Sequence, residues 1–472
     1  MDWQSIGLVL GWIILIYVLS ITLFYILMMA FAYQALAKRK LLDDEMLDDD
    51  LRTNLFTKPV SILVPAYNEE AGIVESLHSL INLRYPESEI IVIDDGSKDS
   101  TAETVIEAFS MKRIYPTIVQ HIETKKVNKV YQSKLHPKVF MIMKENGGKA
   151  DALNTGINLA RYPYFCSIDG DSILDENSLL KVMRPIIASD GKVVAAGGNV
   201  RIANGNDIHF GSLVERQLTR RPVVMMQIIE YLRAFMLGRI FLSRFNMVLI
   251  ISGAFSVFSK RTVIAAGGYT PGVIGEDMEL VVKVHEYLRR TNSDERIEFV
   301  PEPVCWTEAP TTLRVLRRQR RRWSQGLIES LWRHKHMTLN PKYGRIGLFA
   351  FPYFWLFEAL GAVVELGGYI YIIVSFFLGT LYVEMALMLM LALILYGSIF
   401  SSFSLLLEAW TTKNYTRPRT ILAMVLLALS ETFWYRPLTL FWRLEGIYNF
   451  MRKNHDWGRM ERQGLGRGKT QK

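Results

Sequence analysis

The sequence predicts a doubly wound α/β domain with a mainly parallel sheet, flanked at both ends by membrane-spanning helices. Between residues 58 and 310, short apolar runs of strand type alternate with segments of helical length, a pattern typical of parallel strands joined by crossover helices. At the two ends of the chain, long apolar segments replace this alternation. The first of them, from Ile6 to Leu36, carries no charged residue and is long enough to cross a bilayer with some tilt.

Composition supports this division and excludes several classes of protein. Hydrophobic residues make up 50% of the 472 residues, and the excess lies at the two ends of the chain. The two cysteines, Cys166 and Cys305, stand in apolar surroundings, so neither a disulfide framework nor a zinc site is expected. The net charge of +9 comes from basic residues beside hydrophobic segments. We therefore expect contact with anionic lipid, and no nucleic acid as a partner.

The first half of the chain divides into an anchor, a linker and the start of the α/β domain. Residues 1–38 are interpreted as an uncleaved anchor, because the apolar segment is too long for a signal-peptide core and lacks a basic region before it. An acidic linker, 39–57, leads to the α/β domain, 58–310. Strands are predicted at Val60–Val64, Glu89–Ile93, Val139–Met143 and Ile251–Phe258, and helices near Glu69–Leu83, Ser100–Phe109, Ala150–Ala160 and Glu276–Leu288. The polar stretch Met111–Pro137 is predicted to be a surface insertion.

Two later segments combine basic with apolar residues. From Ser212 to Leu249, arginines interleave with Met, Leu, Ile and Phe, namely Arg216, Arg220, Arg221, Arg233, Arg239 and Arg244. A basic amphipathic helix on the membrane and an ordinary helix on the domain surface both fit this pattern. A second basic run, Thr311–His336, predicts a helix in an interface region, 311–343, between the α/β domain and the membrane.

Region 344–450 is predicted to hold three more membrane segments, at Ile346–Leu378, Leu381–Leu407 and Ile421–Trp442. Basic residues between the last two (Lys413, Arg417, Arg419) place that loop in the cytoplasm by the positive-inside rule. The basic tail, 451–472, is also predicted to be cytoplasmic, so we expect the third segment to be re-entrant or interfacial. The protein is therefore predicted to be a multi-pass protein of the cell (plasma) membrane with three crossings and a cytoplasmic α/β domain.

The residues with the clearest chemistry are Asp169-Gly170-Asp171, which end an apolar strand-like run. Residues i and i+2 of an extended chain point to the same side, so Asp169 and Asp171 can converge on one hard cation. Mg²⁺ or Mn²⁺, held partly by substrate phosphates, suits such a pair. A strand end entering an Asx turn is the alternative explanation.

Five further clusters accompany this motif along the chain. Pro65-Ala66-Tyr67-Asn68-Glu69 and Asp94-Asp95-Gly96-Ser97 follow the first two predicted strands, where open α/β sheets bind ligands. Asn146-Gly147-Gly148-Lys149 opens a helix and suits a diphosphate. Gly275-Glu276-Asp277 begins another helix, and Gln319-Arg320-Arg321-Arg322-Trp323 lies in the basic run. Each has an ordinary structural explanation in turn chemistry, the helix dipole or a solvated basic face.

Together these motifs resemble the processive, membrane-embedded family 2 glycosyltransferases, which include the synthases of cellulose, hyaluronan, poly-N-acetylglucosamine and mixed-linkage glucan. That family's signature is an Asp after the second strand, a D-x-D, a T/G-E-D and a Q-x-x-R-W. Here Asp95, Asp169-Gly170-Asp171, Gly275-Glu276-Asp277 and Gln319 to Trp323 match it, over roughly Lys58 to Arg333.

The resemblance implies a GT-A fold, a UDP-sugar donor (UDP-glucose or UDP-N-acetylglucosamine), Mg²⁺ or Mn²⁺, and inversion at the anomeric carbon. Carried over by motif, the nucleotide-sugar would contact Ala66, Tyr67, Asn68, Glu69, Asp95, Lys149, Asp169, Gln319 and Arg322. Asp277, with Glu276 beside it, would be the catalytic base, and Asp169 and Asp171 would hold the metal. Trp323, Ser252 and Gly253 would meet the acceptor, and the other arginines of the basic helix would face the lipid surface.

A cytoplasmic donor and a polar polymer imply export through the membrane. Glu358 and Glu365, seven residues apart on one helix face, suggest an intramembrane path, while a helix–helix hydrogen-bonded pair is the alternative. The tail segment from His455 to Arg462 is similar to the gating segment of hyaluronan-type synthases.

Three hypotheses therefore stand. The first is a processive glycosyltransferase that exports its own β-linked polysaccharide, with the growing polymer, the bilayer and a possible accessory export subunit as partners. The second is a non-processive enzyme making a lipid-linked sugar. The third, a catalytically inactive channel subunit, conflicts with the intact Asp171, Asp277 and Trp323.

Overall fold

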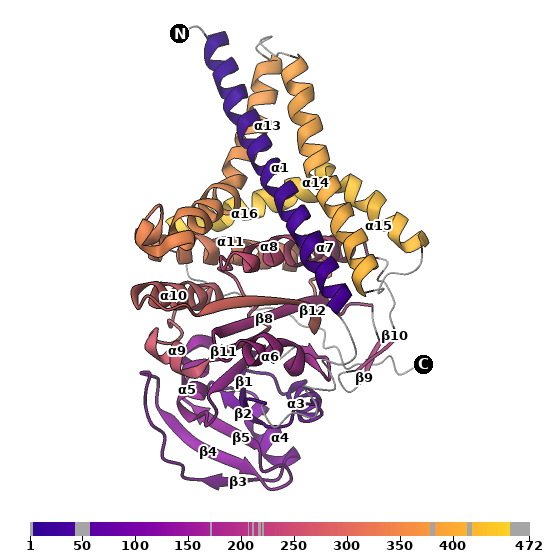
Figure 1. Cartoon of the computed structure of the whole chain (residues 1–472). Coiled ribbons are helices and arrows are strands. Elements are labelled where there is room, and N and C mark those ends of the chain that lie inside the picture. The colour runs from indigo at the N-terminus through magenta and orange to yellow at the C-terminus, as the bar shows by residue number, and fades with distance from the viewer. Residues whose placement is uncertain are drawn as a thin grey trace.

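A computed structural model of the chain describes residues 3–42, 57–169, 172–205, 207–209, 212–215, 219, 221–377, 383–412 and 418–453. Some residues singled out above lie outside these ranges, namely Gly170, Asp171, Arg216, Arg220, Lys413, Arg417, most of the acidic linker and the tail from His455. Figure 1 shows three tiers: the α/β domain at one end, a tier of crossing helices in the middle, and three long helices projecting beyond it.

Within the described residues, the α/β domain is built on one ten-stranded sheet. Its order is β3 (Met111–Ile114), β4 (Val127–Ser133), β5 (Val139–Lys144), β2 (Ser88–Asp94), β1 (Val60–Ala66), β6 (Tyr164–Ile168), β11 (Phe255–Ser259), β8 (Val193–Ile202), β12 (Arg296–Thr307) and β7 (Ile173–Leu174). Strands β9 (Asp207–His209) and β10 (Ser212–Glu215) form a separate antiparallel pair.

The centre of the sheet is parallel, as predicted, but the whole sheet is mixed. Strands β5, β2, β1 and β6 are parallel neighbours, whereas β11 runs antiparallel to both β6 and β8. The parallel strands are buried on both faces because they consist of β-branched and other apolar residues, as in Val60–Val64. The chain reverses its direction of travel across the sheet between β1 and β6, and such a switch point is where open α/β sheets place ligands.

Helices follow the strands in the expected alternation. They are α3 (Ile73–Ile81), α4 (Thr101–Ala108), α5 (Lys149–Leu159), α6 (Ser178–Ala188), α9 (Lys260–Ala265) and α10 (Glu276–Arg290). Helix α5 packs on β1 and β2, and α6 packs on β8 and β12. The core is continuous across these layers; for example, the Phe165 and Phe258 rings of adjacent strands stack at 5.6 Å between centroids and are buried.

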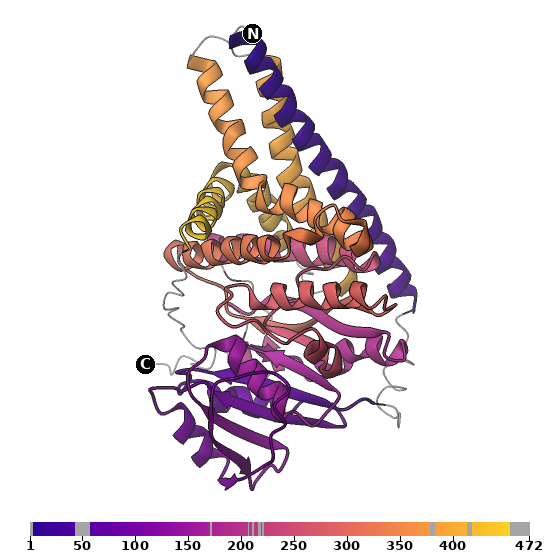
Figure 2. The ribbon, with the colours of Figure 1, turned by 90° about the vertical axis from the view of Figure 1, so that its left-hand side faces the viewer.

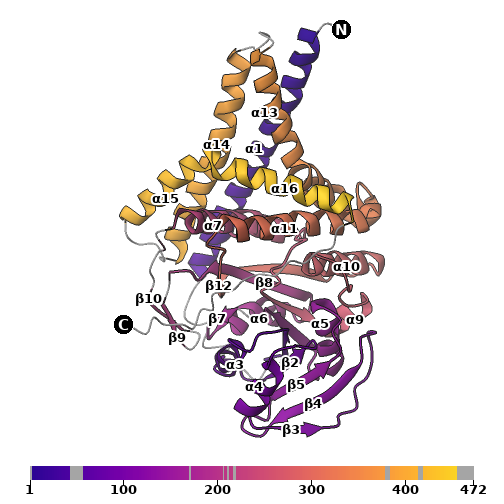
Figure 3. The ribbon, with the colours of Figure 1, turned by 180° about the vertical axis from the view of Figure 1, so that it is seen from behind.

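The middle tier separates the sheet from the long helices (Figures 1 and 3). It contains α7 (Pro222–Arg233), the π-helix η1 (Ala234–Arg239), α8 (Ile240–Arg244), α11 (Leu313–Arg333), α15 (Pro418–Ser430) and α16 (Tyr435–Met451). Helix α11 is capped by Thr312, whose hydroxyl accepts from the Val315 N–H. Helix α11 packs on α16. Gly446 of α16 lets the two backbones approach, because a methyl group at this position would lie 2.5 Å from the Arg321 carbonyl oxygen of α11.

The long helices are α1 (Trp3–Leu42), α13 (Gly361–Phe377) and α14 (Val383–Thr412). Helix α1 packs against both of the others and against α8, although they follow it by hundreds of residues. The Tyr17 hydroxyl donates to the Leu356 carbonyl at 2.9 Å across this contact. Figure 2 shows the three helices leaving the middle tier on the same side.

Among the described helices, Gly7–Lys38 is long and apolar enough to cross a membrane by itself. Two pairs of consecutive helices, each bent at the junction, could each form one further span, which gives up to three spans. The predicted segment Ile346–Leu378 is one such pair. It begins with η4 (Ile346–Ala350), α12 (Phe351–Tyr353) and η5 (Phe354–Ala359), and bends by 42° into α13. The predicted third segment is the other pair, because α15, with η6 (Glu431–Phe433), meets α16 at 53°. The number of crossings stays a prediction.

Several expectations were wrong in detail. Met111–Pro137 is not a plain surface insertion, because β3 and β4 extend the sheet there. Few of their side chains are buried, so the sequence lacks the apolar run of a central strand. Helix α6 and strands β8 and β12 were not predicted. The helix expected from Ser212 begins only at Pro222, after β10.

Candidate functional site

A pocket of about 710 Å³ opens between the sheet and helix α11. Nine of the predicted site residues line it together: Lys149, Asp169, Ser252, Gly253, Glu276, Asp277, Gln319, Arg322 and Trp323. They come from five separate segments of the chain. The structure therefore brings the D-x-D, G-E-D and Q-x-x-R-W motifs to one cavity, at the boundary between the α/β domain and the middle tier.

A lysine and two carboxylates form the floor of this pocket. Lys149 Nζ lies 2.6 Å from Asp169 Oδ1 and 3.2 Å from Glu276 Oε1. Burial alone would lower the pKa of the Lys149 ammonium, but the two carboxylates raise it above its ordinary value. Burial raises the pKa of Glu276, and Asp277 raises it further against the effect of Lys149. Lys149 therefore remains a cation. A further anion that enters the pocket could share its charge with the two carboxylates.

Asp277 is held against the loop that follows Ile251. It lies in the first turn of α10, and its Oδ1 accepts from the Met278 N–H at 2.8 Å. The other oxygen, Oδ2, would lie 3.0 Å from a methyl group on Gly253. Gly253 is thus required for space, and Asp277 directs one oxygen toward the predicted acceptor loop.

The basic helix α11 closes the pocket. Trp323 lines it with 43% of its surface exposed, and its ring lies 6.2 Å from that of Tyr231. Arg320 is not at the lipid surface as expected. It is buried, bonded to Glu230 Oε2 at 2.8 Å and stacked on the Trp323 ring at 4.3 Å. Arg320 therefore holds the Trp323 indole in place by stacking on the ring, and the ion pair with Glu230 in turn holds Arg320.

Two glycines set the distance between the G-E-D motif and α11. A methyl group on Gly275 would meet the Gly326 backbone at 3.2 Å, and one on Gly326 would meet Gly275 at 3.0 Å. Both contacts are with backbone atoms, which cannot rotate away. Helix α11 can therefore approach α10 closely only because neither residue has a side chain.

Asp95 organises the loop before α5. It is buried, and its carboxylate accepts from the N–H groups of Gly147 at 3.0 Å and Gly148 at 2.7 Å. Lys144 Nζ lies 2.6 Å from Asp95 and 2.7 Å from Asp151. Contact between Asp95 and a nucleoside stays a prediction; the described carboxylate holds the loop that positions Lys149.

The loop after β1 is tied to the loop after β2, and it does not line the pocket of Asp277. The Asn68 N–H donates to Ser97 Oγ at 3.0 Å, and Asn68 Oδ1 accepts from the Lys98 N–H at 2.8 Å. The Glu69 N–H donates to Thr101 Oγ1 at 2.8 Å, and Ala66 O accepts from the Asp95 N–H at 2.9 Å. Tyr67 is 45% exposed beside them. These residues form a rim at the strand ends, separate from the catalytic candidates.

Sequence reasoning missed three charged residues at the site, Lys144, Glu230 and Arg239. Arg239 lines the pocket, stacks on the Phe235 ring at 3.8 Å and donates to the Ile250 carbonyl at 3.2 Å. Burial lowers its pKa to about 10, although Asp277 opposes this. A signal existed for Arg239, since it is a cation inside an otherwise apolar run.

The donor set near Asp169 fits a hard divalent cation. Asp169 ends β6, lines the pocket and is 33% exposed at its side chain, so its oxygens are accessible from the cavity. Lys149 Nζ contacts one of these oxygens at 2.6 Å, and the Glu276 carboxylate lies on the same lysine; carboxylate oxygens are the ligand type that suits Mg²⁺ or Mn²⁺. Its predicted partner Asp171 lies outside the described residues.

Glu358 and Glu365, the two carboxylates predicted to lie in the membrane, have partners among the helices. Glu365 forms a two-point ion pair with Arg436 of α16, at 2.6 and 3.2 Å, and Glu358 accepts from the Tyr353 hydroxyl at 3.0 Å. Glu408 pairs with Arg201, and Glu431 pairs with Arg233 at 3.1 Å. For Glu365 the helix–helix pair is thus the interpretation that the geometry favours.

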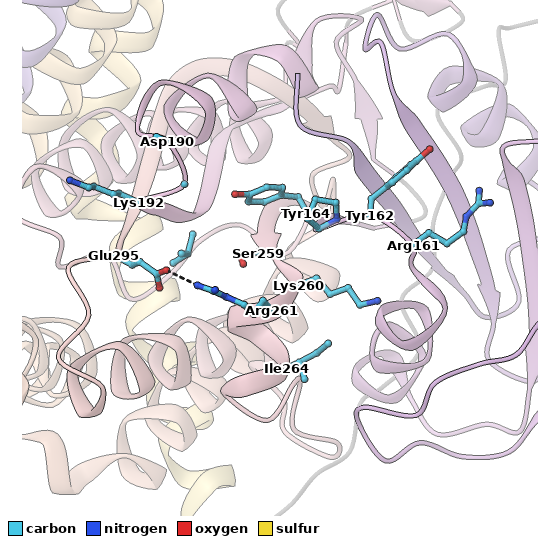
Figure 4. A pocket seen from close by; sticks show the side chains of 13 residues that line it. Arg161, Tyr162, Tyr164, Asp190, Lys192, Ser259, Lys260, Arg261, Ile264 and Glu295 are labelled. Carbon is cyan, nitrogen blue, oxygen red and sulfur yellow. Dashed lines mark hydrogen bonds and ion pairs between the residues drawn. The ribbon is translucent and has the colours of Figure 1, made fainter. Parts of the chain in front are cut away.

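A second pocket, of about 720 Å³, lies at the opposite ends of the strands (Figure 4). Its lining includes Tyr164, Lys192, Lys260 and Arg261, and the Arg261–Glu295 pair at 3.4 Å crosses it. It contains none of the predicted site residues.

Comparisons with known proteins agree with the motifs. The chain matches Glycosyl transferase family 2 over residues 61–260 and Glycosyl transferase family group 2 over residues 164–435. It is 30% identical over 319 residues to the poly-β-1,6-N-acetyl-D-glucosamine synthase of Staphylococcus epidermidis, covering 67% of this chain and 64% of that protein. To the Staphylococcus aureus (strain COL) protein of the same name it is 33% identical, covering 60% of this chain and 58% of the relative. The chain thus spans less than two thirds of these relatives' lengths.

Among solved structures, the mannosyltransferase PcManGT from Pyrobaculum calidifontis, in complex with GDP-Man and Mn²⁺, aligns with a TM-score of 0.43 and 16% identity. That alignment covers 87% of this chain and 99% of the mannosyltransferase.

Proposed function

The chain belongs to glycosyl transferase family 2, and we propose that it polymerises N-acetylglucosamine from UDP-N-acetylglucosamine into a β-linked polysaccharide at a membrane. The observation that carries this proposal is the convergence of Lys149, Asp169, Asp277 and Trp323 on one pocket. The donor sugar is chosen over glucose because the curated relatives reported above are N-acetylglucosamine polymer synthases.

The donor end of the pocket is assigned to Lys149 and Arg322. Lys149 would exchange part of its contact with Asp169 and Glu276 for diphosphate oxygens, which offer it the same kind of charge-assisted hydrogen bond. Mg²⁺ or Mn²⁺, bound by Asp169 and Asp171, would supply further stabilisation of the charge that develops on the leaving UDP. The uridine is assigned to the rim from Ala66 to Glu69.

The acceptor end is assigned to Asp277, the 252–254 loop and Trp323. Asp277 Oδ2, beside Gly253, would accept the proton of the attacking sugar hydroxyl as the new bond forms, a contribution of roughly 10²- to 10⁴-fold in rate. Attack from the face opposite to the diphosphate gives inversion, hence a β-linkage. The exposed Trp323 ring, held by Arg320, would stack on the terminal sugar of the polymer.

The position of this acceptor end supports processive synthesis with export. Trp323 belongs to α11, which packs directly on α16 of the helical region, so each addition would take place beside the entrance to the long helices. A non-processive enzyme that makes a lipid-linked sugar would use the same chemistry, and product size separates the two.

The experiment uses membranes containing the full chain, incubated in parallel with radiolabelled UDP-N-acetylglucosamine and UDP-glucose. We expect high-molecular-weight product from the first donor only, degraded by a hydrolase specific for β-1,6-linked N-acetylglucosamine and resistant to cellulase. Membranes with Asp277→Asn serve as the inactive control. A label that remains in the lipid extract at the size of one sugar would overturn the polymerase proposal, and a glucose polymer would overturn the donor assignment.

A further inference from the structure

A second group of ligand-type side chains lies away from the pocket, where the end of α11 meets the flank of α10 (Figures 1 and 3). It contains Glu286 of α10, His334 at the C-cap of α11 and His336 in the following 3₁₀ turn η2 (Lys335–Met337). One candidate donor atom from each residue lies within 4.8 Å of the others. Glu286 follows Asp277 by nine residues, or about 14 Å along the helix axis, so this group is separate from the transfer site.

The contacts within the group are short and converge on Glu286. His334 Nδ1 lies 2.9 Å from Glu286 Oε2, and His336 Nε2 lies 3.1 Å from Glu286 Oε1. His334 is buried, whereas the side chain of His336 is 49% exposed. An ion could therefore enter from the His336 side.

A fourth residue orients the buried imidazole. Glu279, with 1% of its side chain exposed, places Oε1 3.4 Å from His334 Nε2, and its Oε2 is buried without a hydrogen-bond partner. A carboxylate that accepts from one ring N–H leaves the other ring nitrogen as a lone-pair donor, which is how metal-binding histidines are commonly fixed. With Glu279 on Nε2, the Nδ1 lone pair of His334 points at Glu286.

Both ring nitrogens of His334 face a carboxylate. Nδ1 lies 2.9 Å from Glu286 Oε2, and Nε2 lies 3.4 Å from Glu279 Oε1. Two basic side chains close to this group in sequence have other partners: Lys283 Nζ bonds to the Gly268 carbonyl at 2.7 Å, and Arg333 pairs with Glu329 at 3.8 Å. A divalent cation between Nδ1 and Glu286 would be held by both groups.

We propose that Glu286, His334 and His336 bind Zn²⁺, with Glu279 as the positioning residue of His334. Two imidazole nitrogens and one carboxylate form a three-ligand zinc set, and imidazole disfavours Mg²⁺. The ion would join the end of α11 to α10, the two helices that carry Trp323 and Asp277, and so stabilise their packing. The cysteine count gave no indication of it, because no ligand is a cysteine.

The test is Co²⁺ titration of the full-length protein, purified in detergent without a polyhistidine tag and stripped of metal. We expect one equivalent of Co²⁺ to bind and to give the visible absorption of a low-coordinate site with nitrogen and oxygen ligands. Added Zn²⁺ should displace the Co²⁺ and abolish this absorption. Zn²⁺ should also raise the thermal unfolding midpoint of the protein. His336→Ala and Glu286→Gln should lose this binding; His336 is half exposed, so its removal should not prevent folding.

Three further variants make the result specific. His121→Ala, which removes an exposed histidine elsewhere, should bind Co²⁺ as the parent does. Glu279→Gln should weaken binding by about 10- to 100-fold without removing a ligand. Asp169→Asn should retain Co²⁺ absorption, because the transfer site is a different one. The proposal is overturned if the parent gives no stoichiometric absorption, or if His336→Ala and Glu286→Gln bind Co²⁺ as tightly as the parent.

Discussion

Replacing Gly326 by alanine tests whether the spacing between α10 and α11 controls transfer. The added methyl group would lie 3.0 Å from Gly275 Cα and N, and ordinary contact begins near 3.4 Å, so the helices must separate by about 3.4 − 3.0 = 0.4 Å. Such overpacking costs about 1–3 kcal/mol, offset in part by the roughly 0.5–1 kcal/mol that alanine contributes within a helix. A net loss of up to about 2.5 kcal/mol in unfolding free energy is expected.

The same displacement should also lower the activity of the folded protein. A misplacement of 1 Å costs about 10²-fold in rate, so 0.4 Å, scaled logarithmically, corresponds to about a sixfold loss of kcat. Single-turnover transfer and thermal unfolding would be measured on the same purified protein. Gly367→Ala is the matched control, because a methyl group there meets nothing within 4 Å. Wild-type turnover in Gly326→Ala, or an equal loss in Gly367→Ala, would refute the reasoning.

Four other expectations can be checked alongside it. Asp277→Asn should abolish transfer yet leave UDP affinity, measured by calorimetry, within about threefold, because a base acts on the acceptor; a parallel loss of UDP binding would make Asp277 a donor ligand. Trp323→Ala should shorten the polymer on gels more than it slows hydrolysis of the UDP-sugar by water, and equal losses would contradict an acceptor platform. Because the folded-state pKa of Glu276 is raised, its contribution to stability is present below the usual carboxyl pKa and lost as pH rises through the folded value. The unfolding midpoint of Glu276→Gln should therefore rise relative to the parent as the pH is raised above the usual carboxyl pKa, and a pH-independent difference would count against the buried assignment. Lys144→Met should cost about 3–5 kcal/mol by leaving two buried carboxylates without their cation, whereas the exposed Lys129→Met should not; similar melting of the two variants would show that Lys144 is not needed.

The centre of the fold was predictable because its strands are buried on both faces. Val139–Met143 is a continuous apolar run and Val60–Val64 is apolar except for Ser61, and such runs followed by amphipathic segments are typical of parallel strands with crossover helices. Strand β8 lacks such a pattern, because it contains Gly197 and Gly198, and glycine is unfavourable inside a strand. These glycines are there because methyl groups would lie within 2.0 Å of the Ile251 and Val304 side chains. That requirement depends on tertiary packing and leaves no local pattern.

The site was predictable to the extent that it is made of motifs. Asp169, Asp277 and Trp323 are recognisable from short signatures, and the fold gathers them into one pocket. The residues that support them are not, because their partners are distant in sequence: Lys144 meets Asp95 across 49 positions, and Arg320 meets Glu230 across 90. Spacing rules for one helix or strand carry no information about such pairs.

The packing of α1 against helices that follow it by hundreds of residues constrains how the protein is made. Tyr17 is synthesised 339 residues before its partner Leu356. At about 5–20 residues per second, the ribosome needs roughly 17–70 s to supply that partner. During this interval α1 lacks its partners from α13 and α14, while the α/β domain emerges and can fold. Assembly of the helical region is therefore the last step of biogenesis, and it closes over a domain whose catalytic helices are already in place.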